Sequence, residues 1–339
     1  MKIYENYPLK DLTTFHINAI AKHYVEFTTV DELKEILSSP PVKGNKFIIL
    51  GGGSNVLFSG DYNGFVLCNK ITGIETVSAT GENIFIKFGA GEKWHDVVMY
   101  CVNHNYGGIE NLSLIPGTVG AGPIQNIGAY GVELKDVLTE VSALDVKTLE
   151  IRKISNAECK FGYRESIFKS SEKGAYIILS VTIRLTKDPQ KVNVTYGSLR
   201  KEIETMGITS PTIKDVSDTV IKIRTSKLPD PLKIGNAGSF FKNPAIPDSS
   251  FTKLKSEYPG IVSFPSADGM TKLAAGWLIE QCGWKGKRFG DAGVHIEQAL
   301  VLVNYGNATG KEIYNLSERI IESVNGKFGV RLEREVNII

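Results

Sequence analysis

Hydrophobic residues at alternating positions predict the strands of this chain. Alternation is clearest over 175–185, where every second residue from Ile177 to Leu185 is apolar and the other face carries Ser180, Thr182 and Arg184. A period of two is typical of a strand with one buried face. Shorter apolar runs predict further strands at 46–50, 64–68, 83–88 and 299–303.

Hydrophobic residues three and four positions apart predict the helices. Two helices begin at capping boxes, Thr29–Glu32 and Thr309–Glu312, in which a threonine and a glutamate satisfy free backbone N–H groups. The helical segments are 33–37, 94–102, 215–224, 272–282 and 311–324. Strands and helices do not alternate regularly, which favours an α+β fold. The proline-rich joint Leu228–Pro231 is the best candidate for a domain boundary.

Two glycine-rich segments lie between these elements. Gly51–Asn55 follows a buried strand, and 115–131 carries too many glycines to sustain a regular element. Such turns expose successive backbone N–H groups that hold an anion without basic side chains. Neither segment is a P-loop or a GxGxxG dinucleotide fingerprint. Each alone is also compatible with a tight structural turn, but together they indicate one long ligand, such as a dinucleotide with a pyrophosphate.

A third glycine segment, Gly235–Pro244, predicts a tight turn that carries Ser239. Its two glycines allow a ligand to approach closely, because neither has a Cβ. Ser239 precedes two phenylalanines, which provide a dry environment for a hydroxyl that donates a proton or a hydrogen bond. The alternative is a loop with a buried serine.

Composition narrows the class of protein. The net charge of +2 and the absence of a basic tract argue against nucleic acid as a partner. No leader pattern or membrane-length apolar run occurs, and four scattered cysteines are expected to be reduced thiols of a cytoplasmic protein. Five histidines without HxxxH or HExxH spacing make a metal site unexpected.

Five motifs in register resemble the UDP-N-acetylenolpyruvoylglucosamine reductase family. They are Ile49–Leu57, Ile115–Gly131, Phe161–Lys169, Gly235–Pro244 and Leu332–Val336. The similarity runs from Thr13 almost to the C-terminus. Two departures, Lys160 and Arg334, touch no proposed catalytic position.

The resemblance implies a two-domain FAD-binding module of the vanillyl-alcohol-oxidase (PCMH) type, followed by an α/β substrate-binding domain. FAD-binding subdomain 1 is expected over 1–70, with 335–339 returning to it, and FAD-binding subdomain 2 over 71–226. The substrate-binding domain is expected over 227–334. The cofactor is expected to be non-covalent FAD, with NADPH as co-substrate. The implied FAD-binding residues are Gly51, Gly52, Gly53, Ser54, Asn55, Pro116, Gly117, Thr118, Gly120, Ala121, Asn126, Gly128, Ala129, Tyr130 and Gly131.

The implied catalytic residues are Arg164, Ser239 and Glu335. The residues implied to contact the UDP-sugar are Tyr163, Tyr196, Lys227, Asn243, Lys285 and Gln298. Tyr196 lies in a segment that resembles the closing loop of the longer subclass. The family implies a peptidoglycan-precursor enzyme of the cytoplasm, acting as a monomer, with no membrane or nucleic-acid partner.

The implied reaction reduces an enolpyruvyl ether to a lactyl ether. An arginine fork suits a carboxylate, so Arg164 is expected to hold the enolpyruvyl carboxylate, and Ser239 to protonate C2. Glu335 either orients Arg164 or, if protonated, donates a hydrogen bond to that carboxylate. Two other classes remain: a flavin-dependent oxidase and a non-catalytic UDP-sugar binder. The first is disfavoured because neither FAD-binding segment contains a histidine or cysteine that would tether a flavin.

Overall fold

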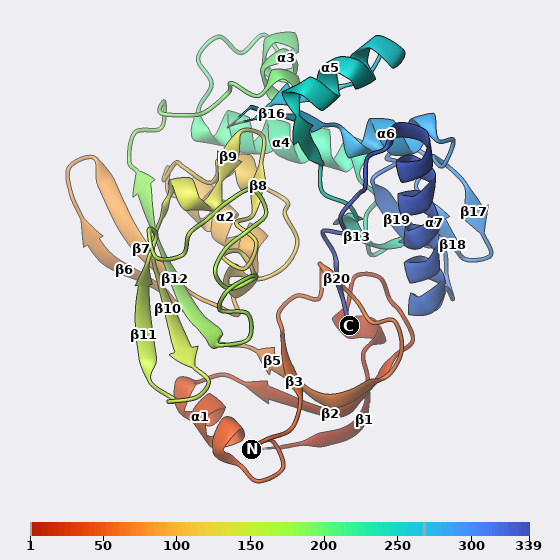
Figure 1. Ribbon diagram of the computed structural model, residues 1–339. Coiled ribbons are helices and arrows are strands. Elements are labelled where there is room, and N and C mark those ends of the chain that lie inside the picture. The colour runs from red at the N-terminus through yellow and green to blue at the C-terminus, as the bar shows by residue number, and fades with distance from the viewer. Residues whose placement is uncertain (1, 267–268) are drawn as a thin grey trace. The chain divides into compact units, whose positions relative to one another are not determined.

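A computed structural model describes residues 2–266 and 269–339 as two compact units (Figure 1). The first unit consists of Met1–Asn6, Lys22–Gly52 and Asn63–Ser226. The second consists of Tyr7–Ala21, Gly53–Tyr62 and Lys227–Ile339. Both units are therefore assembled from segments that lie far apart in the sequence.

A five-stranded antiparallel sheet, in the order β11-β10-β12-β7-β6, dominates the first unit. Helix α2 covers it, and Trp94 and Val98 are buried against strand residues such as Ile86 and Val181. The strands are β6 (Ile74–Ala79), β7 (Asn83–Gly89), β10 (Leu138–Asp145), β11 (Ile151–Ser155) and β12 (Tyr176–Thr186), and the helix is α2 (Trp94–Asn103).

A four-stranded sheet, in the order β1-β2-β5-β3, packs its apolar face against α1. The Thr29 hydroxyl accepts from Glu32 N–H at the start of α1, as the capping box predicts. The strands are β1 (Tyr4–Pro8), β2 (Ile20–Phe27), β3 (Phe47–Leu50) and β5 (Tyr62–Asn69), and the helix is α1 (Val30–Ser38). β3 pairs parallel to β5, which confirms the predicted strand, but the prediction that this run is buried is wrong: only Leu50 is buried, and Ile49 is exposed.

Short elements complete the first unit. Helices α3 (Gly197–Thr205) and α4 (Ile213–Lys227) share an apolar cluster that includes Leu199 and Val220, and Tyr130 packs on it. The hairpin β8 (Gly128–Ala129) and β9 (Val132–Glu133) lies within the glycine-rich segment. The 3₁₀ turns are η1 (Lys10–Leu12) in the second unit, and η2 (Glu110–Leu112), η3 (Val119–Ala121) and η4 (Leu134–Asp136) in the first.

The second unit is built on the sheet β13-β19-β18-β17, which α7 covers. The strands are β13 (Gly235–Ser239), β17 (Arg288–Phe289), β18 (Ala292–Val294) and β19 (Val301–Asn304), and the helices are α6 (Ala275–Gln281) and α7 (Gly310–Phe328). A smaller sheet, β14-β16-β15, carries α5. Its elements are β14 (Ala245–Pro247), β15 (Ser263–Pro265), β16 (Met270–Leu273) and α5 (Asp248–Glu257). The chain end, β20 (Asn337–Ile338), pairs parallel to β4 (Val56–Leu57).

The structure corrects two of the predicted elements. The helix predicted over 272–282 begins only at Ala275, because Lys272 pairs with Ala245 in β16 and Asn243 Oδ1 accepts the Ala275 N–H. The segment Gly235–Ser239 is not a turn but strand β13, with a register shift between Asn236 and Ser239. Gly238, with a φ of 67°, provides the left-handed residue that such a bulge needs.

Candidate functional site

Two glycine segments face each other in the first unit. A Cβ on Gly52 would lie 2.8 Å from the Gly117 Cα, and a Cβ on Gly51 would collide with the Thr118 hydroxyl. Only glycine permits this approach of backbone to backbone. Both pairs line a cavity of about 300 Å³. Its wall is completed by Asn69, Lys70, Gly91, Lys93, His95, Asp96, Ile115 and Pro116.

The remainder of the Gly51–Asn55 turn belongs to the second unit. Gly53 has a φ of 62° and lies against the Leu12 carbonyl, so no side chain fits there. Asn55 Nδ2 donates to the Glu335 carbonyl at 3.4 Å, and the Asn55 carbonyl accepts from Asn337 N–H. Ser54, between Gly53 and Asn55 in the sequence, is half-buried. The turn therefore meets the chain's last strand in the second unit.

Two of the recognised motifs meet in the first unit. Asn126 Nδ2 donates to the Gly162 carbonyl at 3.0 Å, and Arg164 Nη2 donates to the Gly128 carbonyl at 2.8 Å. Arg164 has a φ of 55°, a left-handed conformation that costs energy for a non-glycine residue and is common at functional sites. Its guanidinium also lies 5.5 Å from the ring of half-exposed Tyr163. Arg164 is thus fixed at the glycine-rich segment.

The segment that resembles the closing loop joins this cluster through Tyr196. Its ring meets that of Tyr130 edge to face, with the centroids 5.5 Å apart. Asn111, which is fully buried, donates from Nδ2 to the carbonyls of both Tyr130 and Asn193, at 2.9 and 2.8 Å. Asn193 Nδ2 donates in turn to the Gly131 carbonyl. One amide therefore ties the segment before Tyr196 to the glycine-rich turn.

The other predicted FAD-binding residues lie along the same segment. η3 contains Gly120 and Ala121, and a Cβ on Gly120 would contact Ala90. Ala129 pairs with Val132 across the β8–β9 hairpin.

Positive charge gathers around this cluster. Burial lowers the pKa of the Arg224 guanidinium, and the nearby charge of Arg164 acts in the same direction, whereas Tyr130 opposes it. Arg224 Nε is buried and has no hydrogen-bond partner among the described residues. Burial also lowers the pKa of His95, with the Arg224 charge contributing. A buried guanidinium such as that of Arg224, whose Nε makes no hydrogen bond within the described residues, favours an anionic ligand.

The turn that carries Asn111 contains a buried carboxyl group. Glu110 is 2% exposed and accepts from Gly108 N–H at 2.6 Å. Burial raises the pKa of Glu110, although the N–H groups of Gly108, Ile109 and Glu110 itself oppose the shift. The folded state then retains a proton that the unfolded chain has lost, so stability falls as pH rises above the ordinary glutamate pKa.

Glu110→Gln is expected to remove this loss, because a glutamine oxygen still accepts from Gly108. Relative to wild type, the variant should gain more free energy of unfolding at pH 8 than at pH 4. Urea unfolding at both pH values measures the difference. Equal effects at the two pH values would mean that Glu110 has the same pKa in both states.

Ser239 and Glu335 lie on neighbouring backbone segments of the second unit. Ser239 pairs with Val301 at the bulge of β13, and the next carbonyl, of Phe240, accepts from Glu335 N–H at 2.8 Å. Phe240 and Phe241 are buried, whereas Ser239 is half-buried. Its hydroxyl forms no hydrogen bond within 2–266 and 269–339. It is therefore available to a ligand.

The other residues predicted to contact substrate are distributed over the second unit. Asn243 Oδ1 accepts the Ala275 N–H, and its Nδ2 donates to no group in the described part of the chain; Gln298 Oε1 lies beside Gly276 of α6. Lys285 forms an ion pair with Glu280 at 3.1 Å. Lys227 is an exposed residue at the end of α4.

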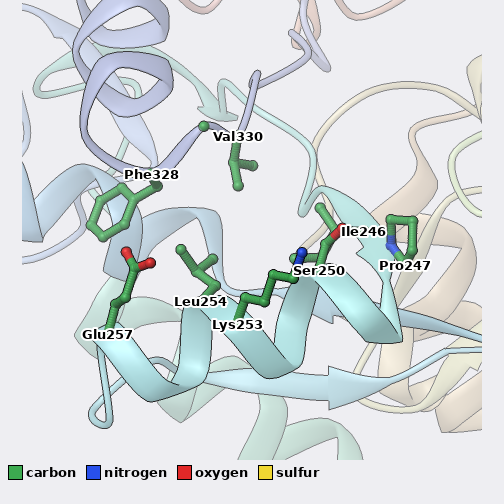
Figure 2. A pocket seen from close by; sticks show the side chains of 9 residues that line it. Ile246, Pro247, Ser250, Lys253, Leu254, Glu257, Phe328 and Val330 are labelled. Atoms are coloured by element: carbon green, nitrogen blue, oxygen red, sulfur yellow. The ribbon is translucent and has the colours of Figure 1, made fainter.

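A second cavity, of about 400 Å³, lies between α5 and the end of α7 (Figure 2). Leu254, Lys253 and Glu257 of α5 point toward it, and Phe328 and Val330 line the opposite wall. None of the predicted catalytic, cofactor or substrate residues lines this cavity.

Comparisons with known proteins identify the family. Residues 21–154 match the model of the FAD binding domain, and residues 230–339 match that of the UDP-N-acetylenolpyruvoylglucosamine reductase C-terminal domain. UDP-N-acetylenolpyruvoylglucosamine reductases of Flavobacterium johnsoniae and Amoebophilus asiaticus are 48% and 49% identical over 339 residues, covering 100% of both chains in each case. The chain belongs to the UDP-N-acetylenolpyruvoylglucosamine reductase family.

A solved structure agrees with this assignment at the level of fold. The crystal structure of the reductase from Thermus caldophilus matches with a TM-score of 0.69 at 23% identity, covering 99% of this chain and 98% of that one. The predicted α+β fold, with an FAD-binding module followed by a substrate domain, is confirmed. As a member of this family with an FAD binding domain, the chain is an FAD-dependent oxidoreductase. The lining of the glycine-lined cavity suits a phosphate group, because Gly51, Gly52 and Gly117 bring backbone to its surface without side chains.

Three residues of the candidate site were not predicted from the sequence. Asn111, Arg224 and His95 acquire their importance from contacts with residues that lie far from them along the chain. No local spacing or motif marks them.

Among the described residues, no helix is long and apolar enough to cross a membrane, and no group of His, Cys, Asp and Glu has the arrangement of a metal site.

Proposed function

We propose that this chain reduces UDP-N-acetylglucosamine enolpyruvate to UDP-N-acetylmuramate, with NADPH as co-substrate. The observation that carries this proposal is the match over the complete length of both chains to proteins named UDP-N-acetylenolpyruvoylglucosamine reductase. Each unit supports it: the first has a glycine-lined cavity and an arginine fixed to the glycine-rich segment at Gly128, and the second has a serine hydroxyl that makes no hydrogen bond within the described residues.

Bound FAD supplies the hydride chemistry, and the chain supplies binding, charge stabilisation and a proton. Arg164 holds the enolpyruvyl carboxylate and stabilises the negative charge that develops on it when C3 receives a hydride. Ser239 then donates its hydroxyl proton to C2. An alcohol is a weak acid, but the carbanion is a far stronger base, so the transfer is feasible.

Glu335 has two possible roles in this proposal. It orients Arg164, or in its protonated form it donates a hydrogen bond to the substrate carboxylate. Glu335 N–H donates to the carbonyl of Phe240, the residue that follows Ser239 in the sequence. This contact supports a role for Glu335 close to the proton donor.

Tyr163, Tyr196, Lys227, Asn243, Lys285 and Gln298 are proposed to contact the UDP-sugar. The free amide hydrogens of Asn243 and the exposed Lys227 suit phosphate oxygens. We also propose the division into 1–70 with 335–339, 71–226 and 227–334, a monomeric state, and a cytoplasmic location for this precursor synthesis.

Turnover of the purified protein tests the proposal. NADPH oxidation at 340 nm should depend on the enolpyruvyl substrate, and mass spectrometry should show a product heavier by two hydrogens. NADPH oxidation that ignores the enolpyruvyl compound and consumes oxygen instead would favour an oxidase and contradict the proposal.

Asn111→Leu should raise the KM for the enolpyruvyl substrate by about tenfold, because the carbonyls of Tyr130 and Asn193 lose their donor and the Tyr196 segment loosens. Asn156→Leu is a matched control: it also removes an amide that donates to two carbonyls, those of Lys135 and Leu138. Steady-state kinetics compares the two. An equal KM change in both variants would show only general destabilisation.

A further inference from the structure

The glycine-lined cavity is lined in part by a histidine ring with one nitrogen held by the backbone. His95, in the first turn of α2, lines the cavity together with Gly51, Gly52, Gly117 and Thr118. Its Nδ1 accepts the Leu114 N–H at 3.0 Å. Its Nε2 has no hydrogen-bond partner in the part of the chain that the structure describes.

The Leu114 contact fixes the state of the ring. Because Nδ1 accepts a backbone N–H, the neutral imidazole carries its hydrogen on Nε2. Burial lowers the pKa of His95, the Arg224 charge acts in the same direction, and Asp96 opposes it. The neutral ring therefore has its donor on the nitrogen that Leu114 does not occupy, in a residue that lines the cavity.

Leu114, which donates its N–H to His95, has a strained backbone. Leu114 has a φ of 58°, in the left-handed region that bulky residues rarely adopt. Leu114 directly precedes Ile115 and Pro116, which line the same cavity. Conformations of this kind persist where the surrounding structure determines them, and they cluster at ligand sites.

We propose that His95 binds the FAD cofactor through an Nε2–H hydrogen bond to an oxygen of the dinucleotide, with Leu114 N–H holding the ring in the required tautomer. This inference depends on the proposed placement of FAD in the glycine-lined cavity. The accepting oxygen belongs either to the pyrophosphate or to a carbonyl of the isoalloxazine ring.

Two substitutions distinguish the contributions of the two ring nitrogens of His95. His95→Asn retains an acceptor at the δ position for Leu114 but loses the donor that reaches the cavity. His95→Gln retains a donor at the ε position but loses the acceptor. Release of FAD on dilution of each holoprotein, followed by flavin fluorescence, gives the dissociation constants.

We expect FAD to bind about 5- to 30-fold more weakly to His95→Asn and within about threefold of wild type to His95→Gln. Wild-type affinity in His95→Asn would overturn the proposal. Equal weakening in both variants would also overturn it, since the Leu114 contact would then be the cause. Wild-type protein without any FAD would instead refute the placement of the cofactor.

A measurement on the unaltered holoprotein requires no variant. In ¹H–¹⁵N correlation spectra of the histidine rings, one Nε2–H should be protected from exchange with FAD bound, and this signal should be absent from His95→Gln. A protonated Nδ1 or an unprotected Nε2–H at residue 95 would contradict the proposal. A shifted flavin absorption maximum in His95→Asn would assign the contact to the isoalloxazine ring, and an unchanged maximum to the pyrophosphate.

Discussion

Ser239→Ala is expected to retain bleaching of the flavin by NADPH and to lose most of its reoxidation by the enolpyruvyl substrate. The Ser239 hydroxyl is half-buried and makes no hydrogen bond within the described ranges, so its removal leaves no protein partner unsatisfied. Removal of a positioned proton donor typically lowers a rate by about 10²–10⁴-fold. Anaerobic stopped-flow absorbance measures both half-reactions separately.

Ser263→Ala is the matched control for this experiment. Ser263 is also a half-buried serine on a strand of the second unit, β15, but it has no predicted role. Both half-reactions should remain at the wild-type rate in the control. If Ser239→Ala reoxidises as fast as the control, then Ser239 is not the proton donor.

Gly52→Ala is expected to abolish FAD retention at ordinary protein concentrations. Its Cβ would lie 2.8 Å from the Gly117 Cα and 3.2 Å from the Gly117 carbonyl carbon. Backbone atoms cannot rotate away as a side chain does, so the two glycine segments must separate. Overpacking of this kind costs about 1–3 kcal/mol, which corresponds to binding weakened by about 5- to 150-fold.

Gly81→Ala controls for the loss of a glycine in the same unit. Gly81 lies between β6 and β7, and a Cβ there would contact nothing within 4 Å. The flavin-to-protein absorbance ratio after gel filtration compares the variants. A full complement of FAD in Gly52→Ala would show that the cofactor does not depend on the close approach of these two turns.

Long periodic segments were predictable from the sequence because burial alone fixes their pattern. The alternation over 175–185 became β12, and the capped segments after Thr29 and Thr309 became α1 and α7. Capping boxes and one-sided hydrophobicity are local signals, and no distant residue is needed to interpret them.

Elements whose structure depends on distant partners were not predictable. β13 is rich in glycine and small residues, which favours a turn, but its pairing with β19 makes it a strand. β16 carries no alternation and forms only through pairing with β14 and β15. Tertiary pairing here outweighs local preference.

The residues of the candidate site also fall into those that the sequence predicts and those that depend on distant contacts. The glycine turns, Arg164 and Ser239 lie in motifs and were identified from the sequence. Asn111 acts through Asn193, which is 82 residues away, and no sequence feature predicts that contact. His95 likewise acquires its state from a contact with Leu114, 19 residues away, which no motif predicts.

Anaerobic stopped-flow of the wild-type protein tests the central claim most directly. The account predicts a yellow protein whose flavin absorbance is bleached by NADPH and restored by the enolpyruvyl UDP-sugar in the absence of oxygen. Flavin that stays bleached on addition of that substrate, or a protein that NADPH does not bleach, would contradict it.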